Sequence, residues 1–73
     1  MIAVQVNGKP VELPQRTALT DYLAQLGVEP RAVAIEVNGR ILDRSEFEIT
    51  TLEDGDAVEI VRMVGGGLSV RAR

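Results

Sequence analysis

The sequence predicts an α+β fold in which a single helix packs across one face of a small mixed sheet. Segments with strand-like alternation occur in the order strand, strand, helix, strand, short strand, strand, which fits neither a βαβαβ repeat nor an all-β chain. Two Asn-Gly dipeptides mark tight hairpins, and one segment carries apolar residues at helical spacing. The 73 residues are enough for one domain and no more.

The first predicted element is a hairpin. Asn7-Gly8 tolerates the two positive φ angles of a type I′ turn, and Pro14 ends the return strand because it lacks an N–H donor. Apolar residues alternate with other residues on both sides of the turn: Ile2, Val4, Val6, Val11 and Leu13.

A short helix is predicted next. Thr17 is the predicted N-cap, and Asp21 lies early, near the positive end of the helix. Gly27 suits the left-handed position that ends a helix, with Val28 making the accompanying apolar contact. The apolar stripe has spacings of three, four and seven residues: Leu19, Tyr22, Leu23 and Leu26.

The remaining chain is predicted to complete the sheet. Residues 33–37 alternate as a strand, Asn38-Gly39 repeats the hairpin signal, and Ile41-Leu42 forms a short return strand. Residues 43–52 are less regular, with Phe47, Ile49 and Leu52 as expected core anchors. Residues 57–64 form the last strand, expected to be central and parallel to the first. One core is expected within residues 1–64: Val4, Val6, Leu19, Leu23, Leu26, Ile35 and Ile60.

Composition excludes several function classes. The chain has no His and no Cys, so the commonest metal ligands, the usual general base and the best protein nucleophile are missing. Net charge is −3 and aromatic residues are few, which makes nucleic-acid binding a poor fit and favours docking to a basic protein surface. No apolar run is long enough for a signal peptide or a membrane span, so a cytoplasmic protein is expected.

The glycine run Gly65-Gly66-Gly67 is the feature that the fold does not explain. Glycine costs backbone entropy in a strand, so three in succession after a strong strand serve another purpose or none. A glycine tail without Cβ atoms could thread a narrow tunnel and offer an unhindered carboxylate for activation. A flexible linker is the alternative, and the glycines alone leave both open. Residues 65–73 show no continued alternation and are expected to be a flexible tail, with 68–73 as a removable extension.

The segment from Val58 to Gly67, preceded by Asp54-Gly55-Asp56, resembles the C-terminal signature of the ThiS family, the thiamine-biosynthesis sulfur carriers. The resemblance extends over residues 1–67 and depends on the order of elements, the length and the Val-Gly-Gly-Gly end. It implies the β-grasp fold of ubiquitin. The related molybdopterin carriers usually are longer and lack this end, so they are the second choice. A plain β-grasp interaction module with an inert tail is the third.

The resemblance implies a carrier that is not itself an enzyme and is monomeric when free. An adenylyltransferase related to ubiquitin-activating enzymes would adenylate the terminal glycine, using its own ATP. A persulfide from a cysteine desulfurase or a rhodanese-like donor would convert the end to a thiocarboxylate. Thiazole synthase, or another acceptor enzyme, would take the sulfur. The carrier would need no cofactor of its own.

One departure from the family pattern concerns Leu68–Arg73. Family members typically end at the glycines, and a glycine carbonyl held in an amide cannot be adenylated. The expected working end is therefore Gly67, exposed by cleavage of the Gly67–Leu68 bond, with Gly66 as the alternative end. Some ubiquitin-like carriers are trimmed by a metalloprotease, which is the protease expected here.

A docking surface for partners is expected at Val61, Met63 and Val64. If Val58 and Ile60 face the core, Val61 points outward beside the tail, where an exposed apolar patch would bind a partner. A partly covered sheet face is the alternative. Asp54 and Asp56 are candidates for a metal pair, but a solvated turn is the preferred interpretation because the loop lacks the length and the acidic ligand of a calcium-binding loop. Tyr22 is expected in the core with its hydroxyl at the edge. Arg40, Arg44 and Arg62 are expected to be ordinary surface charges.

Overall fold

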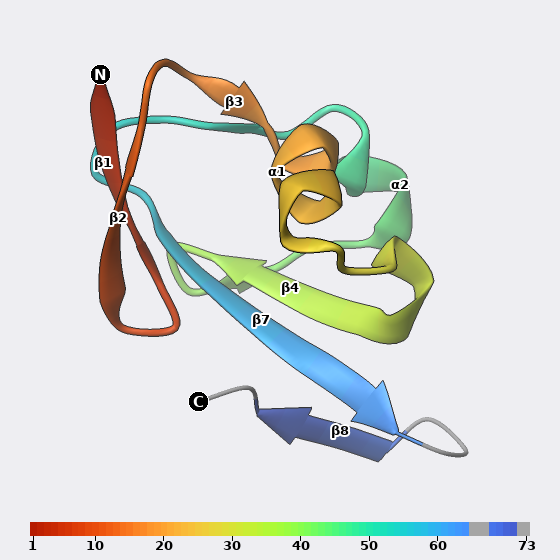
Figure 1. Ribbon diagram of the computed structural model, residues 1–73. Helices are drawn as coiled ribbons and strands as arrows, with labels where there is room; N and C mark the ends of the chain where they lie inside the picture. The colour runs from red at the N-terminus through yellow and green to blue at the C-terminus, as the bar shows by residue number, and fades with distance from the viewer. Residues whose placement is uncertain (65–67, 72–73) are drawn as a thin grey trace.

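The architecture consists of one main helix lying across a mixed sheet (Figure 1), and the computed structural model describes residues 1–64 and 68–71. The chain order of the elements is β1 (Ile2–Val6), β2 (Lys9–Leu13), β3 (Thr17–Ala18), α1 (Leu19–Leu26), a 3-10 turn η1 (Pro30–Ala32), β4 (Val33–Val37), β5 (Arg40–Ile41), α2 (Arg44–Phe47), β6 (Thr51–Leu52), β7 (Ala57–Val64) and β8 (Leu68–Arg71).

The main sheet has the strand order β2-β1-β7-β4-β5, with β8 paired to β7 outside this path. Strand β7 runs parallel to β1 and antiparallel to β4, and the two hairpins β1–β2 and β4–β5 are antiparallel. The predicted central last strand, parallel to the first, is therefore confirmed. A second, two-stranded sheet pairs β3 with β6, and no pattern in the sequence predicted it.

Both hairpin turns have the backbone that the Asn-Gly pattern predicts. Asn7 and Gly8 have φ angles of 52° and 82°, and Asn38 and Gly39 have 53° and 85°. Two consecutive positive φ angles are the signature of the type I′ turn, whose twist matches that of the flanking strands. Gly27 ends α1 with φ 71°, in the left-handed conformation expected of a helix-ending glycine.

The core lies between α1 and the sheet, and most of the predicted members are buried in it. Leu26 is an exception at 46% exposure, because it is the last residue of α1 and lies beyond the end of the core although its angular position on the stripe is right. Ile49 is 80% exposed, because the turn of α2 before it breaks the period-two alternation that joined it to Phe47. Val6 is half-buried against the core. The buried set is Val4, Leu13, Leu19, Tyr22, Leu23, Val33, Ile35, Leu42, Phe47, Leu52, Val58 and Ile60.

The start of α1 differs from the prediction. Ala18 is the N-cap, without a side-chain cap, and the predicted cap residue Thr17 is paired with Leu52 in the β3–β6 ladder. The Thr17 hydroxyl donates to the Gln15 carbonyl instead of accepting from the helix. The Leu19 N–H is satisfied by the Thr50 carbonyl at 2.9 Å. Tertiary pairing thus replaces the local cap, which a single segment of sequence does not reveal.

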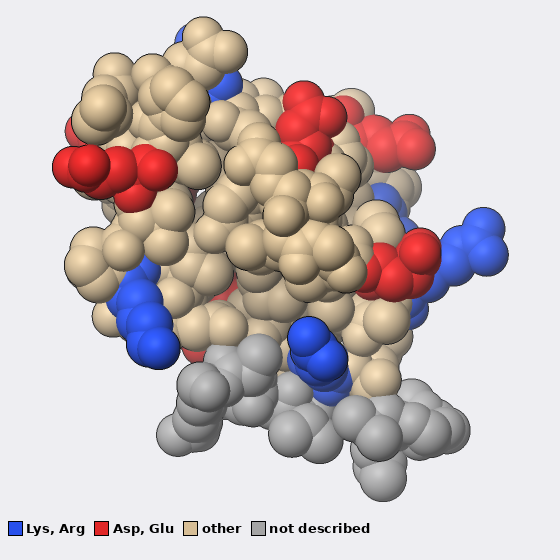
Figure 2. All heavy atoms as spheres, in the orientation of Figure 1, with Lys and Arg blue, Asp and Glu red and all other residues tan. Residues whose placement is uncertain are grey.

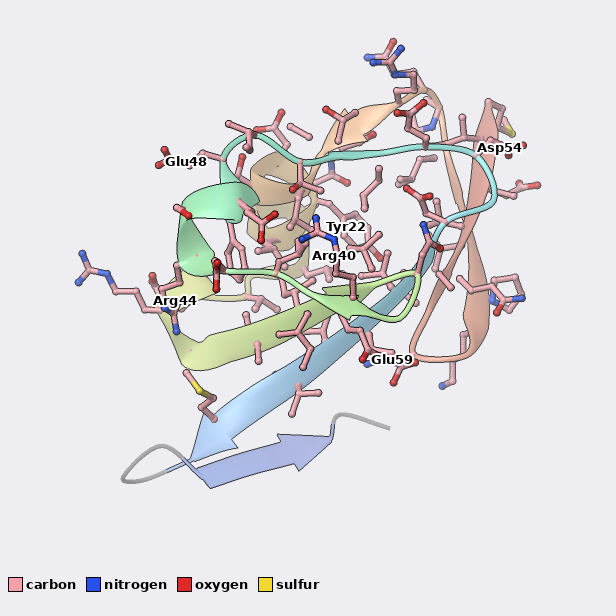
Figure 3. All side chains as sticks on the ribbon, turned by 180° about the vertical axis from the view of Figure 1, so that it is seen from behind. Tyr22, Arg40, Arg44, Glu48, Asp54 and Glu59 are labelled. Atoms are coloured by element: carbon pink, nitrogen blue, oxygen red, sulfur yellow. The ribbon has the colours of Figure 1, made fainter. Side chains whose placement is uncertain are left out.

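Arg44 is not the ordinary surface charge that was expected. Its guanidinium donates to the backbone carbonyls of Pro30 and Arg31, and its charged centre lies 5.9 Å from the centroid of the Phe47 ring. This side chain therefore links α2 to η1. Figure 3 shows Arg44 beside α2. Arg40 also has a partner, an ion pair with Glu46 at 2.9 Å.

The strand β8 is the largest difference from the sequence analysis. No regular structure was expected after Gly65, yet Leu68–Arg71 pairs antiparallel with Val61–Val64. Leu68 and Val70 do alternate with Ser69 and Arg71, so a strand pattern was present but too short to stand out. The expected mobility of the tail stays a prediction.

Candidate functional site: the tail root at the end of β7

The strand that leads to the glycines is anchored at its start by the two hairpin asparagines. Asn7 Oδ1 accepts from the Ile60 N–H at 2.8 Å, and Asn38 Oδ1 accepts from the Ala57 N–H at 2.9 Å. Asn38 Nδ2 also donates to Asp56 Oδ1 at 3.0 Å. The two side chains thus hydrogen-bond β7 at opposite edges, Asn7 from the β1–β2 hairpin and Asn38 from the β4–β5 hairpin. The repeated Asn-Gly pattern predicted the turns, but nothing in it indicated this second role.

Side-chain alternation along β7 places two of the predicted docking residues, Val61 and Met63, on the outward side. Val58 and Ile60 are buried at 1% and 5% exposure, whereas Val61 and Met63 are half-buried. Successive side chains of a strand point to opposite faces, so Val61 and Met63 share the face opposite α1. Val64, the third docking residue, is the last residue of β7.

The outward face of the sheet changes character along β7. Val61 lies directly opposite Ala34 in the β4–β7 register, so this end of the face is apolar. One step toward the start of β7, Glu59 lies opposite Glu36. Figure 3 shows the Glu59 side chain on the side of the sheet away from α1. The tail root, residues 61–64 at the end of β7, thus presents Val61 and Met63 on this face beside two carboxylates. This combination suits a partner surface that has both apolar and basic groups.

A groove opens beside the tail root. It has a volume of about 470 Å³ and runs between the segment after α1 and the last part of β7. Gly27, Val28 and Glu29 line one side, and Arg62 and Met63 line the other. The groove and the outward face thus meet at Met63.

The predicted sulfur-carrying residues Gly65, Gly66 and Gly67 lie outside the described residues. Their neighbours on both sides are placed, since Val64 pairs with Leu68 in the β7–β8 register. The glycine run therefore connects two residues that are partners in one ladder. This position follows from the register and chain connectivity alone.

The alternative metal pair at Asp54 and Asp56 is not supported. Asp54 Oδ1 accepts from the Ala3 N–H at 2.8 Å, and Asp56 Oδ2 accepts from the Glu53 N–H at 2.8 Å. Both carboxylates thus close a turn against the sheet. Within residues 1–64 and 68–71, no group of three His, Cys, Asp or Glu is placed to hold a metal ion. Tyr22 is buried as predicted, and burial raises the pKa of its hydroxyl.

The surface charges are mixed. In the view of Figure 2, acidic and basic side chains are interspersed around the periphery and do not form a cationic stripe on that face. Such a stripe is what a nucleic-acid backbone would need. In the part of the chain that the structure describes, no helix is long and apolar enough to cross a membrane.

Comparison with known proteins decides among the carrier families. The model of the ThiS family matches residues 4–67. The chain belongs to the ThiS family. It is 37% identical over 65 residues to the sulfur carrier protein ThiS of Bacillus subtilis, covering 88% of this chain and 98% of that protein. It is also 33% identical over 64 residues to the thiazole synthase of Magnetococcus marinus, of which it spans only 20%.

The fold comparison agrees. The crystal structure of the thiamine biosynthesis protein ThiS of Geobacter metallireducens has a TM-score of 0.79 and 39% sequence identity, with 90% of this chain and 100% of that chain covered. The predicted β-grasp fold is therefore confirmed. The ThiS family match stops at Gly67, so Leu68–Arg73 lies beyond it.

Proposed function

We propose that this chain is a sulfur carrier for thiamine-type thiazole biosynthesis, and that its working end is Gly67 after removal of Leu68–Arg73. The observation that carries the proposal is the end of the family match at Gly67, directly after the glycine run. The compact body supports a carrier role, since its buried apolar residues form one core, the chain has no His and no Cys, and the carboxylates of Asp54 and Asp56 are engaged in a turn. The chain itself is then a recycled co-substrate and not an enzyme.

The chemistry at Gly67 requires a free carboxylate. Hydrolysis of the Gly67–Leu68 amide supplies it, and an adenylyltransferase then joins it to AMP from ATP with release of pyrophosphate. A persulfide on the sulfur donor displaces AMP, and a thiol cleaves the resulting S–S bond to leave the thiocarboxylate. Glycine suits this end because no Cβ obstructs the approach of the activating and accepting enzymes.

The acceptor is a thiazole synthase in this proposal. Support comes from the thiazole synthase of Magnetococcus marinus, 33% identical over 64 residues, of which the matching portion is a fifth. A carrier-like segment within the same chain as the acceptor is the arrangement expected of two proteins that work together. The sulfur donor, a cysteine desulfurase or a rhodanese-like protein, and the trimming metalloprotease belong to the proposal on the family resemblance.

The docking surface proposed for the activating enzyme is the end of β7 with Val61, Met63 and Val64. Val61 and Met63 share the outward face, and Met63 also borders the groove with Arg62. This surface lies next to the glycines in the chain, so a partner bound there holds the tail close to its own active site. The acidic pair Glu36 and Glu59 lies on the same face and suits a basic rim on the partner.

Intact mass of the protein isolated from its native host tests the proposal. A chain ended at Gly67, in carboxylate or thiocarboxylate form, is the expected species. Trimming removes Arg71 and Arg73, so 6 basic residues remain against 11 acidic ones and the net charge changes from −3 to −5. Isoelectric focusing separates the two forms for this reason. Full-length chain alone, with no trimmed or sulfur-bearing form under thiamine-limited growth, would favour the interaction module with an inert tail.

A further inference from the structure

The edge of β7 that faces β1 has two successive occupants. Strand β1 pairs with β7 only through Gln5 opposite Ala57 and Val6 opposite Val58. Asn7 then turns away into the hairpin, and its side chain covers the Ile60 N–H. Within residues 1–64, no strand is described as pairing with this edge from Val61 onward. Figure 1 shows β8 lying along this last part of β7.

The backbone groups that β8 covers can be assigned from the alternation along β7. The Val58 carbonyl accepts from the Asn7 N–H, and Ile60 faces the Asn7 side chain, so even-numbered residues turn their N–H and C=O toward this edge. Arg62 and Val64 continue this series. Their register partners are Val70 and Leu68, which makes these two the hydrogen-bonded pairs of the β7–β8 ladder.

The opposite edge gives the end of β7 little support. The ladder with β4 ends at Val33 opposite Arg62, so among the described pairings Met63 and Val64 have only β8 as a partner. An unpaired strand end exposes N–H and C=O groups that readily accept another extended segment. The chain supplies such a segment itself, joined by a connection of three glycines.

We propose that the backbone edge of β7 at Arg62 and Val64 accepts an additional strand, and that Leu68–Arg71 of the same chain occupies it. This pairing keeps the untrimmed chain in a latent form, in which the chain covers its own edge. The proposal rests on the proposed function in one respect, that Leu68–Arg73 is removed before the glycine end is used. Pairing with β8 then competes with the extended conformation that a protease needs at the Gly67–Leu68 bond. Trimming, once done, uncovers the edge.

Amide hydrogen exchange tests the pairing without any sulfur chemistry. The Arg62 and Val64 N–H groups should exchange about tenfold or more faster in a chain ended at Gly67 than in the full-length chain, because they lose their hydrogen-bond acceptors. Val61 is the internal control, since its N–H faces β4 and its protection should not change. Equal exchange of Arg62 and Val64 in both chains would overturn the proposal.

An engineered disulfide tests the register and the latency together, since the natural chain has no Cys. Met63 and Ser69 are directly opposite in a non-hydrogen-bonded pair, a position where Cα atoms lie about 4.5 Å apart and a disulfide fits. M63C/S69C should oxidise readily in a glutathione buffer. The matched control M63C/V70C should not, because neighbouring residues of a strand point to opposite faces. Equal oxidation of the two would contradict the register.

The same variant measures latency against a defined protease, thermolysin, which cleaves before bulky apolar residues such as Leu68. The oxidised M63C/S69C chain should be cut at Gly67–Leu68 at least about tenfold more slowly than the reduced chain, as local opening must precede cleavage. Equal cleavage rates of the oxidised and reduced chains would contradict the proposed latent form. The activation of a chain ended at Gly67 involves no β8, so its success or failure tests the proposed function separately.

Discussion

The two halves of β7 are held in different ways. Ala57–Ile60 lies between β1 and β4, and the side chains of Asn7 and Asn38 add a hydrogen bond on each edge. In Val61–Val64, the β4 ladder stops at Arg62, and among the strands that the structure describes only β8 pairs with the other edge. The first half belongs to the core, with Val58 and Ile60 buried, whereas Val61 and Met63 are only half-buried.

This difference separates stability from function along one strand. The first half is fixed by burial and by partners far apart in sequence, so its conformation does not depend on the tail. The second half depends on residues that the proposed function removes. A sulfur carrier needs both properties, because a rigid body is recognised while the glycine end, once Leu68–Arg73 is removed, has to enter another protein.

The largest expected effect is on the body. Leu23 on α1 is fully buried, and Leu23→Ala should lower the free energy of unfolding by about 2 to 5 kcal/mol. Leu26→Ala is the matched control on the same helix, since Leu26 is 46% exposed, and should cost less than about 1 kcal/mol. Urea unfolding measures both. A loss below about 0.5 kcal/mol for Leu23→Ala would mean that the helix face is assigned wrongly.

The second half should instead control partner binding. Val61→Asp and Met63→Asp place a charge on the proposed docking surface, and each should weaken binding to the activating enzyme at least about tenfold, or ~1.4 kcal/mol. Gln5→Asp introduces the same charge on the exposed part of strand β1 and should bind normally. Titration calorimetry, with circular dichroism to check the fold, measures this effect. Unchanged affinity in both variants would exclude this surface.

The asparagine contact at the boundary between the halves should have a moderate effect. Asn7→Gly keeps a residue that tolerates the φ of 52° but removes the side chain that accepts from the Ile60 N–H. The expected loss of unfolding free energy is about 1 to 2 kcal/mol, from the missing hydrogen bond and the added chain entropy. Gly8→Ala tests the turn backbone alone. If Asn7→Gly is as stable as the natural chain, the hydrogen bond from the Ile60 N–H to the Asn7 side chain contributes nothing to the free energy of unfolding.

The smallest expected effect is a pH dependence far from the tail. Hydrogen bonds from the Asp43 N–H and from Arg40 lower the pKa of the Glu46 carboxyl below its usual value. A lowered folded-state pKa means stability that is present above the usual carboxyl pKa and lost as pH falls through the folded-state value. Glu46→Gln should therefore flatten the stability profile in this acid range alone. An unchanged profile below pH 5 would contradict this assignment.

The sequence predicted the parts of the fold that depend on local patterns. The type I′ turns at Asn7-Gly8 and Asn38-Gly39 and the end of α1 at Gly27 follow from backbone requirements that few residue types meet. The start of α1, the exposure of Ile49 and the role of Arg44 depend on distant partners, such as the β3–β6 ladder and the carbonyls of η1. The short alternation at Leu68–Arg71 could be recognised as a strand only from the fold, which shows an edge of β7 that β1 does not cover beyond Val58.

The most direct test of the central claim uses purified activating enzyme, ATP and two forms of this chain. A chain ended at Gly67 should form an acyl-adenylate and release pyrophosphate, whereas the full-length chain should do neither until Leu68–Arg73 is cleaved off. Mass spectrometry identifies the adenylated residue. Adenylation of the full-length chain without loss of residues, or an inert Gly67 end beside a reactive Gly66 end, would contradict the account.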